Sequence, residues 1–379
     1  MKISQLKFDA ENGWVEISND ANPKTSQLVV IFGSTDLMKE VKNYDEIKNK
    51  YPNAIFAGCS TAGEIIDTMV NDDTLVATAI EFESSNLVSK CVSISSSDES
   101  YFKAKELVDA LPKDGLKHVF VLSDGLRVNG SELVKGFREN LPDHIKVTGG
   151  LAGDGANFKE TFVIGSENTS KENIITAIGF YGENLEISYG SLGGWDSFGI
   201  ERLVTKSKNN VLFELDRQPA LQLYKSFLGE HAAGLPASGL LFPLNLRTES
   251  DDTPVVRTIL AVDEQTQSLT FAGDIPEGSY VRLMKANFDR LIKGAEGAAE
   301  KTISESKSSP DLAILISCVG RKLVLKQMIE EEVESVKEVL GKNTKMCGFY
   351  SYGEISPFSK NAKCELHNQT MTITTFKEV

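Results

Sequence analysis

The feature that most constrains this chain is a pattern that recurs three times along it. A short apolar run is followed by a polar loop, a helix-like segment and a second apolar run that ends in a glycine turn. A strand, a helix and a second strand within roughly 30 residues are typical of a βαβ unit with parallel strands. Two more strand-like segments follow each turn, so each copy is predicted to be a β-α-β-turn-β-β unit. The first runs and the turns lie at 28–33 and 58–65, at 119–125 and 149–154, and at 312–318 and 348–355.

The three copies also predict how the chain is divided. A proline or glycine that stops a helix follows each helix-like segment. These segments are 36–50, 131–140 and 323–340. Between copies two and three the pattern changes to short strands with Gly-containing turns, and helices are expected at 219–228 and 287–306. We therefore predict an α/β protein with mixed sheets, built from repeated units in two packed domains: residues 1–210 with two copies and residues 211–379 with one.

Charge and composition exclude several classes of protein. Of the 379 residues, 41% are hydrophobic and 25% are charged, which is typical of a globular protein. The net charge of −14 argues against binding to nucleic acid or to anionic lipid. No apolar segment reaches the roughly 20 residues that span a bilayer, and the N-terminus lacks the apolar core of a signal peptide. Five cysteines without a CxxC pair indicate reduced thiols, and we expect a cytoplasmic protein.

The glycine turns and the polar strand ends are the expected ligand site. Glycine permits sharp turns and lets backbone N–H groups approach a ligand closely. The carboxylates at the turns could bind an ammonium group, and we expect the three turns to line one cavity. The candidate residues are Cys59, Ser60, Thr61, Gly63, Glu64, Asp124, Gly149, Gly150, Asp154, Cys318, Tyr350, Tyr352 and Glu354.

Four further residues complete the predicted site. Arg321 follows the first strand of copy three, where a guanidinium could clamp a ligand carboxylate with two hydrogen bonds. Trp195 lies close to glycines and is expected to form a lid or to pack at a domain interface. His367 and Asn368 interrupt the final strand-like segment, where they either lie on an exposed strand face or enter the cavity.

The sequence contains no recognisable catalytic constellation, and we expect a protein that is not an enzyme. The loop at 149–155 lacks Gly-Lys-Ser/Thr and runs into an extended segment, which argues against nucleotide binding. A Cys or Ser nucleophile needs a base, and the sequence pairs none of the four histidines with Cys59. A hydrolase that uses Cys59 or Cys318 remains the enzymatic alternative, and a structural adaptor is another.

The glycine turns, together with three further motifs, resemble the FIST sensory proteins. Their order is similar to a FIST N-terminal domain followed by a FIST C-terminal domain, over nearly the whole chain. One departure is Asp216-Arg217-Gln218-Pro219, where the family more usually has Asp-Gly-x-Pro. The motifs are 58–65, 149–154, Phe213-Glu214-Leu215-Asp216 with Pro219-Ala220, Ser317-Cys318-Val319-Gly320-Arg321, 348–355 and Leu366-His367-Asn368-Gln369-Thr370.

The resemblance implies an intracellular sensor that binds a small ligand, either an amino acid or a small carboxylate. FIST domains also occur joined to histidine kinases, chemotaxis receptors and cyclic-dinucleotide enzymes. We therefore expect signal transduction through a partner of this kind, as in bacterial two-component signalling, and a homodimer is one expected assembly. Some members resemble haem-based nitric oxide sensors. That alternative would place a non-covalent haem b here with His367 as its axial ligand, and no other metal or cofactor is expected.

Overall fold

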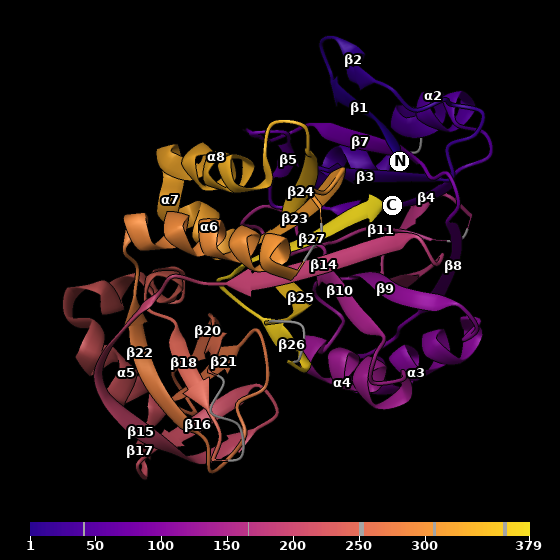
Figure 1. The fold of residues 1–379 in the computed structure, drawn as a ribbon. Coiled ribbons are helices and arrows are strands. Elements are labelled where there is room, and N and C mark those ends of the chain that lie inside the picture. Colours follow the sequence, from indigo (N-terminus) through magenta and orange to yellow (C-terminus); the bar gives the residue numbers. More distant parts are fainter. Residues whose placement is uncertain (41, 166, 250–253, 306–307, 359–361) are drawn as a thin grey trace.

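The chain folds into three related units around a shared core, with a fourth sheet inserted into the third unit (Figure 1). Each unit contains a parallel strand pair joined by helices, an antiparallel strand beside it and a short hairpin. The predicted fold class, mixed α/β sheets built from repeated units, is confirmed. The computed structural model describes residues 1–40, 42–165, 167–249, 254–305, 308–358 and 362–379.

The three units have corresponding elements. Unit one consists of β1 (Lys2–Asp9), β2 (Gly13–Asn19), β3 (Leu28–Gly33), α1 (Thr35–Lys39), α2 (Lys42–Lys50), β4 (Ile55–Ser60), β5 (Glu64–Ile66), β6 (Met69–Asn71) and β7 (Leu75–Glu81). Unit two consists of β8 (Asn86–Ser93), α3 (Ser100–Ala110), β9 (Leu116–Ser123), α4 (Gly130–Asn140), β10 (Lys146–Leu151), β11 (Val163–Ile164), β12 (Ser170–Lys171) and β13 (Ile174–Tyr181). Unit three consists of β14 (Leu185–Leu192), α6 (Phe288–Glu305), β23 (Leu312–Cys318), α7 (Val319–Leu325), α8 (Ile329–Leu340), β24 (Lys345–Ser351), β25 (Gly353–Pro357), β26 (Cys364–His367) and β27 (Met371–Glu378).

The hairpin of each unit completes the sheet of another unit. β5 of unit one pairs with β24 of unit three, β25 of unit three pairs with β10 of unit two, and β11 of unit two pairs with β4 of unit one. Each unit therefore gives one hairpin and receives one, in a closed cycle. As a result the sheets share one strand order: β12-β11-β4-β3-β7-β1 with β2 added at its edge, β26-β25-β10-β9-β13-β8, and β6-β5-β24-β23-β27-β14.

The first strand of each parallel pair is buried on both faces. One face points into a core that all three sheets share, and the alternate residues belong to clusters that include helix residues. Burial on both faces explains why these strands read as continuous apolar runs rather than as alternating ones. The residues that face the shared core are Val30 and Phe32 of β3, Phe120 and Leu122 of β9, and Ile314 and Ile316 of β23.

At the same position in each unit, a glycine lies opposite a residue of the neighbouring parallel strand, and the two backbones come very close together. A Cβ atom on Gly58 would lie 1.9 Å from the Ile31 carbonyl oxygen, and one on Gly149 would lie 1.9 Å from that of Val121. In unit three, a Cβ atom on Gly348 would lie 1.8 Å from the Leu315 oxygen. These glycines are therefore required by the close approach of the two parallel strands, whatever else the turns after them do.

The fourth sheet lies between β14 and α6 in the sequence and has a hydrophobic core of its own. The predicted boundary between residues 210 and 211 falls in the turn between β15 and β16, which pair with each other. The division into domains 1–210 and 211–379 therefore stays a prediction. The inserted elements are β15 (Asp196–Lys208), β16 (Val211–Leu215), β17 (Gln218–Pro219), α5 (Ala220–Leu228), β18 (Leu244–Arg247), β19 (Val255–Arg257), β20 (Ile259–Asp263), β21 (Ser268–Phe271) and β22 (Tyr280–Lys285).

The predicted helices are present, with some bounds altered. The segment 36–50 forms two helices, because the extended backbone of Glu40 ends α1. In copy three the helical region begins at Val319, directly after β23, and a short 3-10 turn at Lys326–Met328 separates α7 from α8. The strands β1, β2 and β8 and the helix α3 were not predicted, because they precede the apolar runs by which the recurring sequence pattern was defined.

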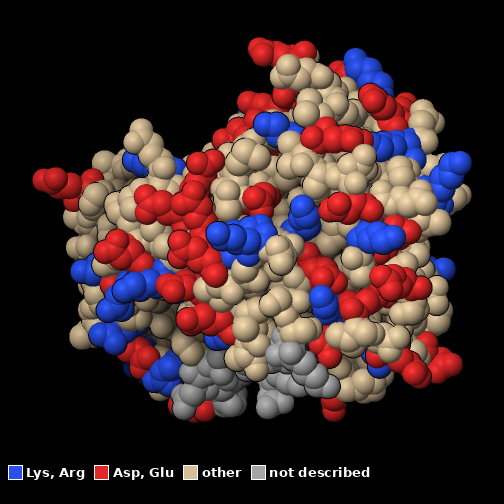
Figure 2. Space-filling model, turned by 45° about the horizontal axis from the view of Figure 1, so that its top comes forward, with Lys and Arg blue, Asp and Glu red and all other residues tan. Residues whose placement is uncertain are grey.

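Acidic side chains are spread over the face shown in Figure 2, with basic ones interspersed among them, in keeping with the net charge of −14. None of the helices in the described parts of the chain has the length and apolar character needed to cross a membrane.

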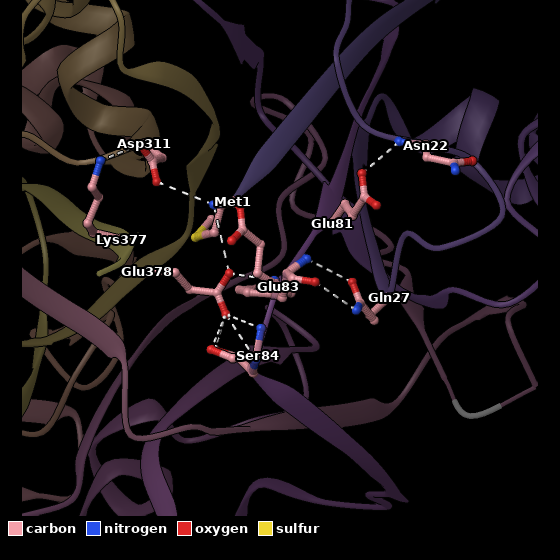
Figure 3. Close-up of polar contacts among 11 residues, drawn as sticks. Met1, Asn22, Gln27, Glu81, Glu83, Ser84, Asp311, Lys377 and Glu378 are labelled. Carbon is pink, nitrogen blue, oxygen red and sulfur yellow. Dashed lines mark hydrogen bonds and ion pairs between the residues drawn. The ribbon is translucent and has the colours of Figure 1, made fainter.

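The two ends of the chain meet beside units one and three. The Met1 amino group forms ion pairs with Glu83, Asp311 and Glu378 (Figure 3). Burial alone would raise the pKa of Glu378, but hydrogen bonds from the Glu83 and Ser84 amides and the Ser85 hydroxyl lower this pKa on balance. This network ties the first strand to the last one and so closes the ring of units.

The glycines Gly58, Gly149 and Gly348 at the close approach of the parallel strands give a first prediction. In Gly348→Ala the new methyl group would meet the Leu315 carbonyl, so β23 and β24 must separate, and we expect the free energy of unfolding to fall by roughly 3 kcal/mol in urea denaturation. Gly165→Ala is the control, because its Cβ would meet only side chains, at 3.4 and 3.5 Å. Equal losses in the two variants would contradict the close-approach argument.

Candidate functional site

The three glycine turns bond to one another where the units meet. In each bond a backbone N–H of one turn donates to a carbonyl of the next turn, at equivalent positions in all three units. The bonds run from Ala62 to Tyr350 (2.8 Å), from Gly153 to Ser60 (2.9 Å) and from Tyr352 to Leu151 (3.2 Å). The expectation that the turns line one cavity is therefore corrected. The turns are in direct contact, and the cavities lie between neighbouring units.

A cavity of about 290 Å³ lies between the turns of units one and two. Four of the predicted site residues line it: Thr61, Gly63, Glu64 and Asp154. Its volume is near the lower end for ligand pockets, so it suits a small metabolite. The other lining residues are Ser34, Thr35 and Asp36 after β3, Ala62, Asp72 and Asp73 in unit one, and Gly155, Asn157, Lys159 and Glu160 in unit two.

Carboxylates dominate the wall of this first cavity. Six of its lining residues are acidic and one, Lys159, is basic. Two lysines from outside the lining neutralise part of this charge, since Lys322 of α7 pairs with Asp72 and Lys39 pairs with Glu160. The described residues contain no cluster of three or more His, Cys, Asp or Glu side chains that could hold a metal ion.

Glu64 is the most deeply buried carboxylate of the first cavity, with 1% of its surface exposed. It accepts hydrogen bonds from the hydroxyls of Thr61 (2.5 Å) and Thr74 (2.7 Å), and among the described residues it forms no ion pair. Burial raises the pKa of Glu64 to about 7, because the hydroxyl hydrogen bonds only partly offset the loss of hydration. The group therefore changes charge near neutral pH.

Glu354 occupies the equivalent position in unit three and has an equivalent environment. The hydroxyls of Ser351 (2.7 Å) and Thr370 (3.0 Å) donate to it, and burial raises its pKa to about 8. Glu354 lines neither the first cavity nor any of three others described for this structure. The two glutamates thus share their chemistry but differ in their access to a ligand.

Unit two uses its carboxylates to hold its own backbone. Asp124 accepts hydrogen bonds from the amides of Leu126 (2.8 Å) and Arg127 (2.6 Å) at the end of β9. Asp154 accepts from the amides of Phe158 and Lys159, both at 2.7 Å, and the Tyr352 hydroxyl also donates to it. Asp154 therefore fixes the loop that forms one wall of the first cavity.

Arg321 lies in a buried ion pair rather than in a cavity. Its Nε donates to Glu332 (2.6 Å), its Nη1 donates to the carbonyls of Gly193 and Gln369, and its Nη2 donates to the carbonyl of Leu291 (2.7 Å). Each guanidinium nitrogen is thus engaged within the protein. A ligand carboxylate would have to displace Glu332, so Arg321 is not part of the site that we describe.

Two aromatic residues of the predicted site form hydrogen bonds within unit three. The Tyr350 hydroxyl donates to Glu332 (2.9 Å), and the Trp195 indole donates to the Gln369 carbonyl (2.9 Å). Both residues are buried, so Trp195 packs between the inserted sheet and unit three and is not a mobile lid over a cavity. Tyr352 instead stacks on Phe158, with ring centroids 4.3 Å apart, where units three and two meet.

The surroundings of His367 do not fit a haem ligand. The side chain is fully buried, its Nε2 lies 2.7 Å from the Ser356 carbonyl, and its ring packs 4.2 Å from that of Phe358. Burial lowers the pKa of His367 to about 4. It lines none of the four cavities, and haem would need a large apolar space beside it. Asn368 is also fully buried, and its side-chain amide has no hydrogen-bond partner among the described residues.

The cysteines are not placed for nucleophilic catalysis. Burial raises the pKa of the Cys59 thiol and that of the Cys318 thiol well above the usual range, so both are protonated at neutral pH. Ser60 accepts a hydrogen bond from the Phe162 amide (2.9 Å), which joins β4 to the β11–β12 hairpin of unit two. Gly149 and Gly150 lie within β10, where close neighbours leave no room for a side chain.

Sequence reasoning missed several residues of the first cavity. Ser34 and Thr35 follow β3 in the way that Asp124 follows β9 and Cys318 ends β23, so the repeat itself could have identified them. Asp72 and Asp73 lie in the turn before β7 and carried no such signal.

Comparison with known proteins identifies the family. The FIST N domain model matches residues 27–218, and the FIST C domain model matches residues 220–357. The chain belongs to the FIST family. FIST domains are sensory rather than catalytic domains, and they generally bind small ligands.

Two individual proteins are similar to this FIST protein. An uncharacterized protein of Methanocaldococcus jannaschii is 25% identical over 363 residues, which cover 88% of this chain and 68% of that protein. Cyanuric acid hydrolase from A. caulinodans matches in structure over 78% of this chain and 99% of its own, at 10% identity. Its TM-score of 0.19 is too low to carry an argument.

The buried glutamates give a second prediction. The pKa of Glu354 is raised, so the folded protein keeps a proton that the unfolded chain releases above pH 4.5, and stability should fall as the pH rises towards 8. In Glu354→Gln the fall in the free energy of unfolding with pH should be smaller, by up to about 1.4 kcal/mol per pH unit. Urea denaturation at pH 5 and pH 8 measures this free energy for both proteins. If the free energy changes equally with pH in the wild type and the variant, the prediction is wrong.

Proposed function

We propose that this FIST protein senses a small molecule with an ammonium group, which binds in the first cavity. The observation that carries the proposal is Glu64, a buried carboxylate without an ion-pair partner among the described residues, in a wall made mostly of acidic side chains. An ammonium ion there would compensate the charge of Glu64, which burial alone disfavours. The first cavity also has the volume of a small metabolite site.

An amino acid fits this cavity better than a carboxylate without an ammonium group. The acidic wall repels a simple anion, whereas an amino acid can place its ammonium group at Glu64. Its carboxylate would then meet Lys159 and the hydroxyl of Thr35, which lies buried without a partner among the described residues. These two residues replace Arg321 as the candidate partners of the ligand carboxylate.

The proposed output is a change in the contact between units one and three. Lys322 of α7 donates to the Ala62 carbonyl (2.9 Å) and pairs with Asp72, so unit three contacts the wall of the first cavity. A bound cation would compete with Lys322 for this acidic wall and so favour one of two arrangements of α7. A signalling protein such as a histidine kinase, a chemotaxis receptor or a cyclic-dinucleotide enzyme would read that arrangement.

The raised pKa of Glu64 gives a third prediction. An ammonium ligand needs ionised Glu64, so below pH 7 binding must release a proton, and affinity should rise with pH and level off above about 7. Calorimetric titration with a panel of amino acids and small amines at pH 6 and pH 8 measures both the affinity and the proton release. Glu64→Gln should abolish both the binding and its dependence on pH.

Glu354→Gln is the matched control, because two hydroxyl groups also donate to Glu354, from Ser351 and Thr370, but it lines none of the four cavities. It should bind the same ligands with wild-type affinity. If Glu64→Gln binds them as well as the wild type does, the ligand does not occupy the first cavity and the proposal is wrong.

A further inference from the structure

A second cavity, of about 450 Å³, lies where three parts of the molecule meet. Helix α4 of unit two forms one wall, and the strands β18 and β19 of the inserted sheet form another. Four residues of unit three form the third wall: Phe358, Ala362, Lys363 and Glu365. Figure 1 shows β26 between α4 and the inserted sheet. This second cavity shares no lining residue with the first cavity, so it would be a separate site.

The charge of the second cavity is opposite to that of the protein as a whole. The chain has 54 acidic and 40 basic residues, but five basic and three acidic residues line this cavity. An anion would therefore be attracted here in spite of the net charge of −14. The basic residues are Lys135, Arg138, Arg247, Arg257 and Lys363.

Arg257 is a buried cation in the lining, with 5% of its surface exposed. Its guanidinium donates to the backbone carbonyls of Asp274 (3.1 Å), Val256 (3.2 Å) and Leu366 (3.0 Å). Its Nη2 group takes part in none of these bonds, and no carboxylate among the described residues forms an ion pair with it. Burial lowers the pKa of Arg257, and the nearby carboxylates of Glu365 and Asp274 offset this effect only in part. Because a buried charge is costly, Arg257 would gain from an anion that Nη2 can bind.

The other cations differ in how much charge they can offer to a ligand. Arg138 pairs with Glu365, and Lys135 lies 3.2 Å from Glu132, in contacts that are partly exposed and therefore weak. Lys363 is exposed and forms no ion pair with any described residue. Arg247 donates two hydrogen bonds to the Glu201 carboxylate and therefore contributes less charge to a ligand.

We propose that the second cavity binds a small molecule with two or more negative charges, either a phosphate ester or a polycarboxylate. Arg257 would bind one anionic group at the base through Nη2, and Lys135, Arg138 and Lys363 would bind the outer groups. A guanidinium at the base suits the planar arrangement of carboxylate and phosphate oxygens. The ligand would contact unit two, the inserted sheet and unit three at once, beside existing polar contacts such as the hydrogen bond of Asn129 to Asp274 (3.0 Å).

Calorimetric titration of the intact protein with inorganic pyrophosphate and with citrate tests this proposal. Binding of either probe, weakened by added potassium chloride, is the expected result. Stronger binding of pyrophosphate assigns the site to phosphate esters, and stronger binding of citrate assigns it to polycarboxylates. If neither probe binds at millimolar concentration, the proposal is overturned.

Variants locate the binding to the second cavity. The double variant Lys135→Ala/Arg138→Ala changes only partly exposed helix residues and should fold, while binding about tenfold or more weakly, as expected for the loss of roughly 1.4 kcal/mol. Arg257→Gln should bind more weakly still, and the double variant keeps the test valid if Arg257→Gln does not fold.

Two controls separate this site from other effects. Lys117→Ala removes an exposed lysine of β9 that lies outside the second cavity, and it should leave the affinity unchanged. Glu64→Gln should also keep full affinity for the anion, because it changes only the first cavity. If Lys117→Ala weakens binding as much as the double variant does, the attraction is non-specific and the proposal fails.

Discussion

The structure depends on the exchange of one short hairpin between each pair of neighbouring units. Because β5, β11 and β25 each complete the sheet of another unit, no unit can satisfy the edge of its own sheet alone. Three backbone hydrogen bonds between the glycine turns close the same cycle at its centre. Within each unit, the strand that leads into the turn approaches its parallel partner too closely for a side chain at Gly58, Gly149 or Gly348.

The surroundings of the glycine turns differ from one unit to the next. Between units one and two the strand end after β3 is small and polar, and an acidic cavity remains open. In unit three, Arg321 and Glu332 after β23 form a buried ion pair, and the Trp195 indole donates to the same Gln369 carbonyl as Arg321. A buried pair of this kind does not have to add net stability, but removal of one partner would leave an unpaired charge in the core.

Equivalent positions in the repeat have therefore acquired different roles. Glu64 and Glu354 are bonded to hydroxyl groups in the same way, and burial raises both pKa values. Only Glu64 lines the first cavity, so the same residue type faces a cavity in one unit and is enclosed by the protein in another. In unit two the carboxylates Asp124 and Asp154 hold backbone amides instead. Equivalent turns therefore have different surroundings within this one chain.

The sequence by itself determined the repeated units, their helices and the residues of the glycine turns, because apolar runs, helix stops and glycines act locally. It also indicated Thr61, Gly63, Glu64 and Asp154, since polar groups at a strand end are visible in the pattern. Only the tertiary structure decided which sheet each hairpin joins, because a hairpin has the same local sequence whichever edge it pairs with. It also decided that Arg321 is bound to Glu332 and that His367 is enclosed. Partners brought together from distant segments leave no local signal, so the sequence could assign these side chains to a ligand that their surroundings exclude.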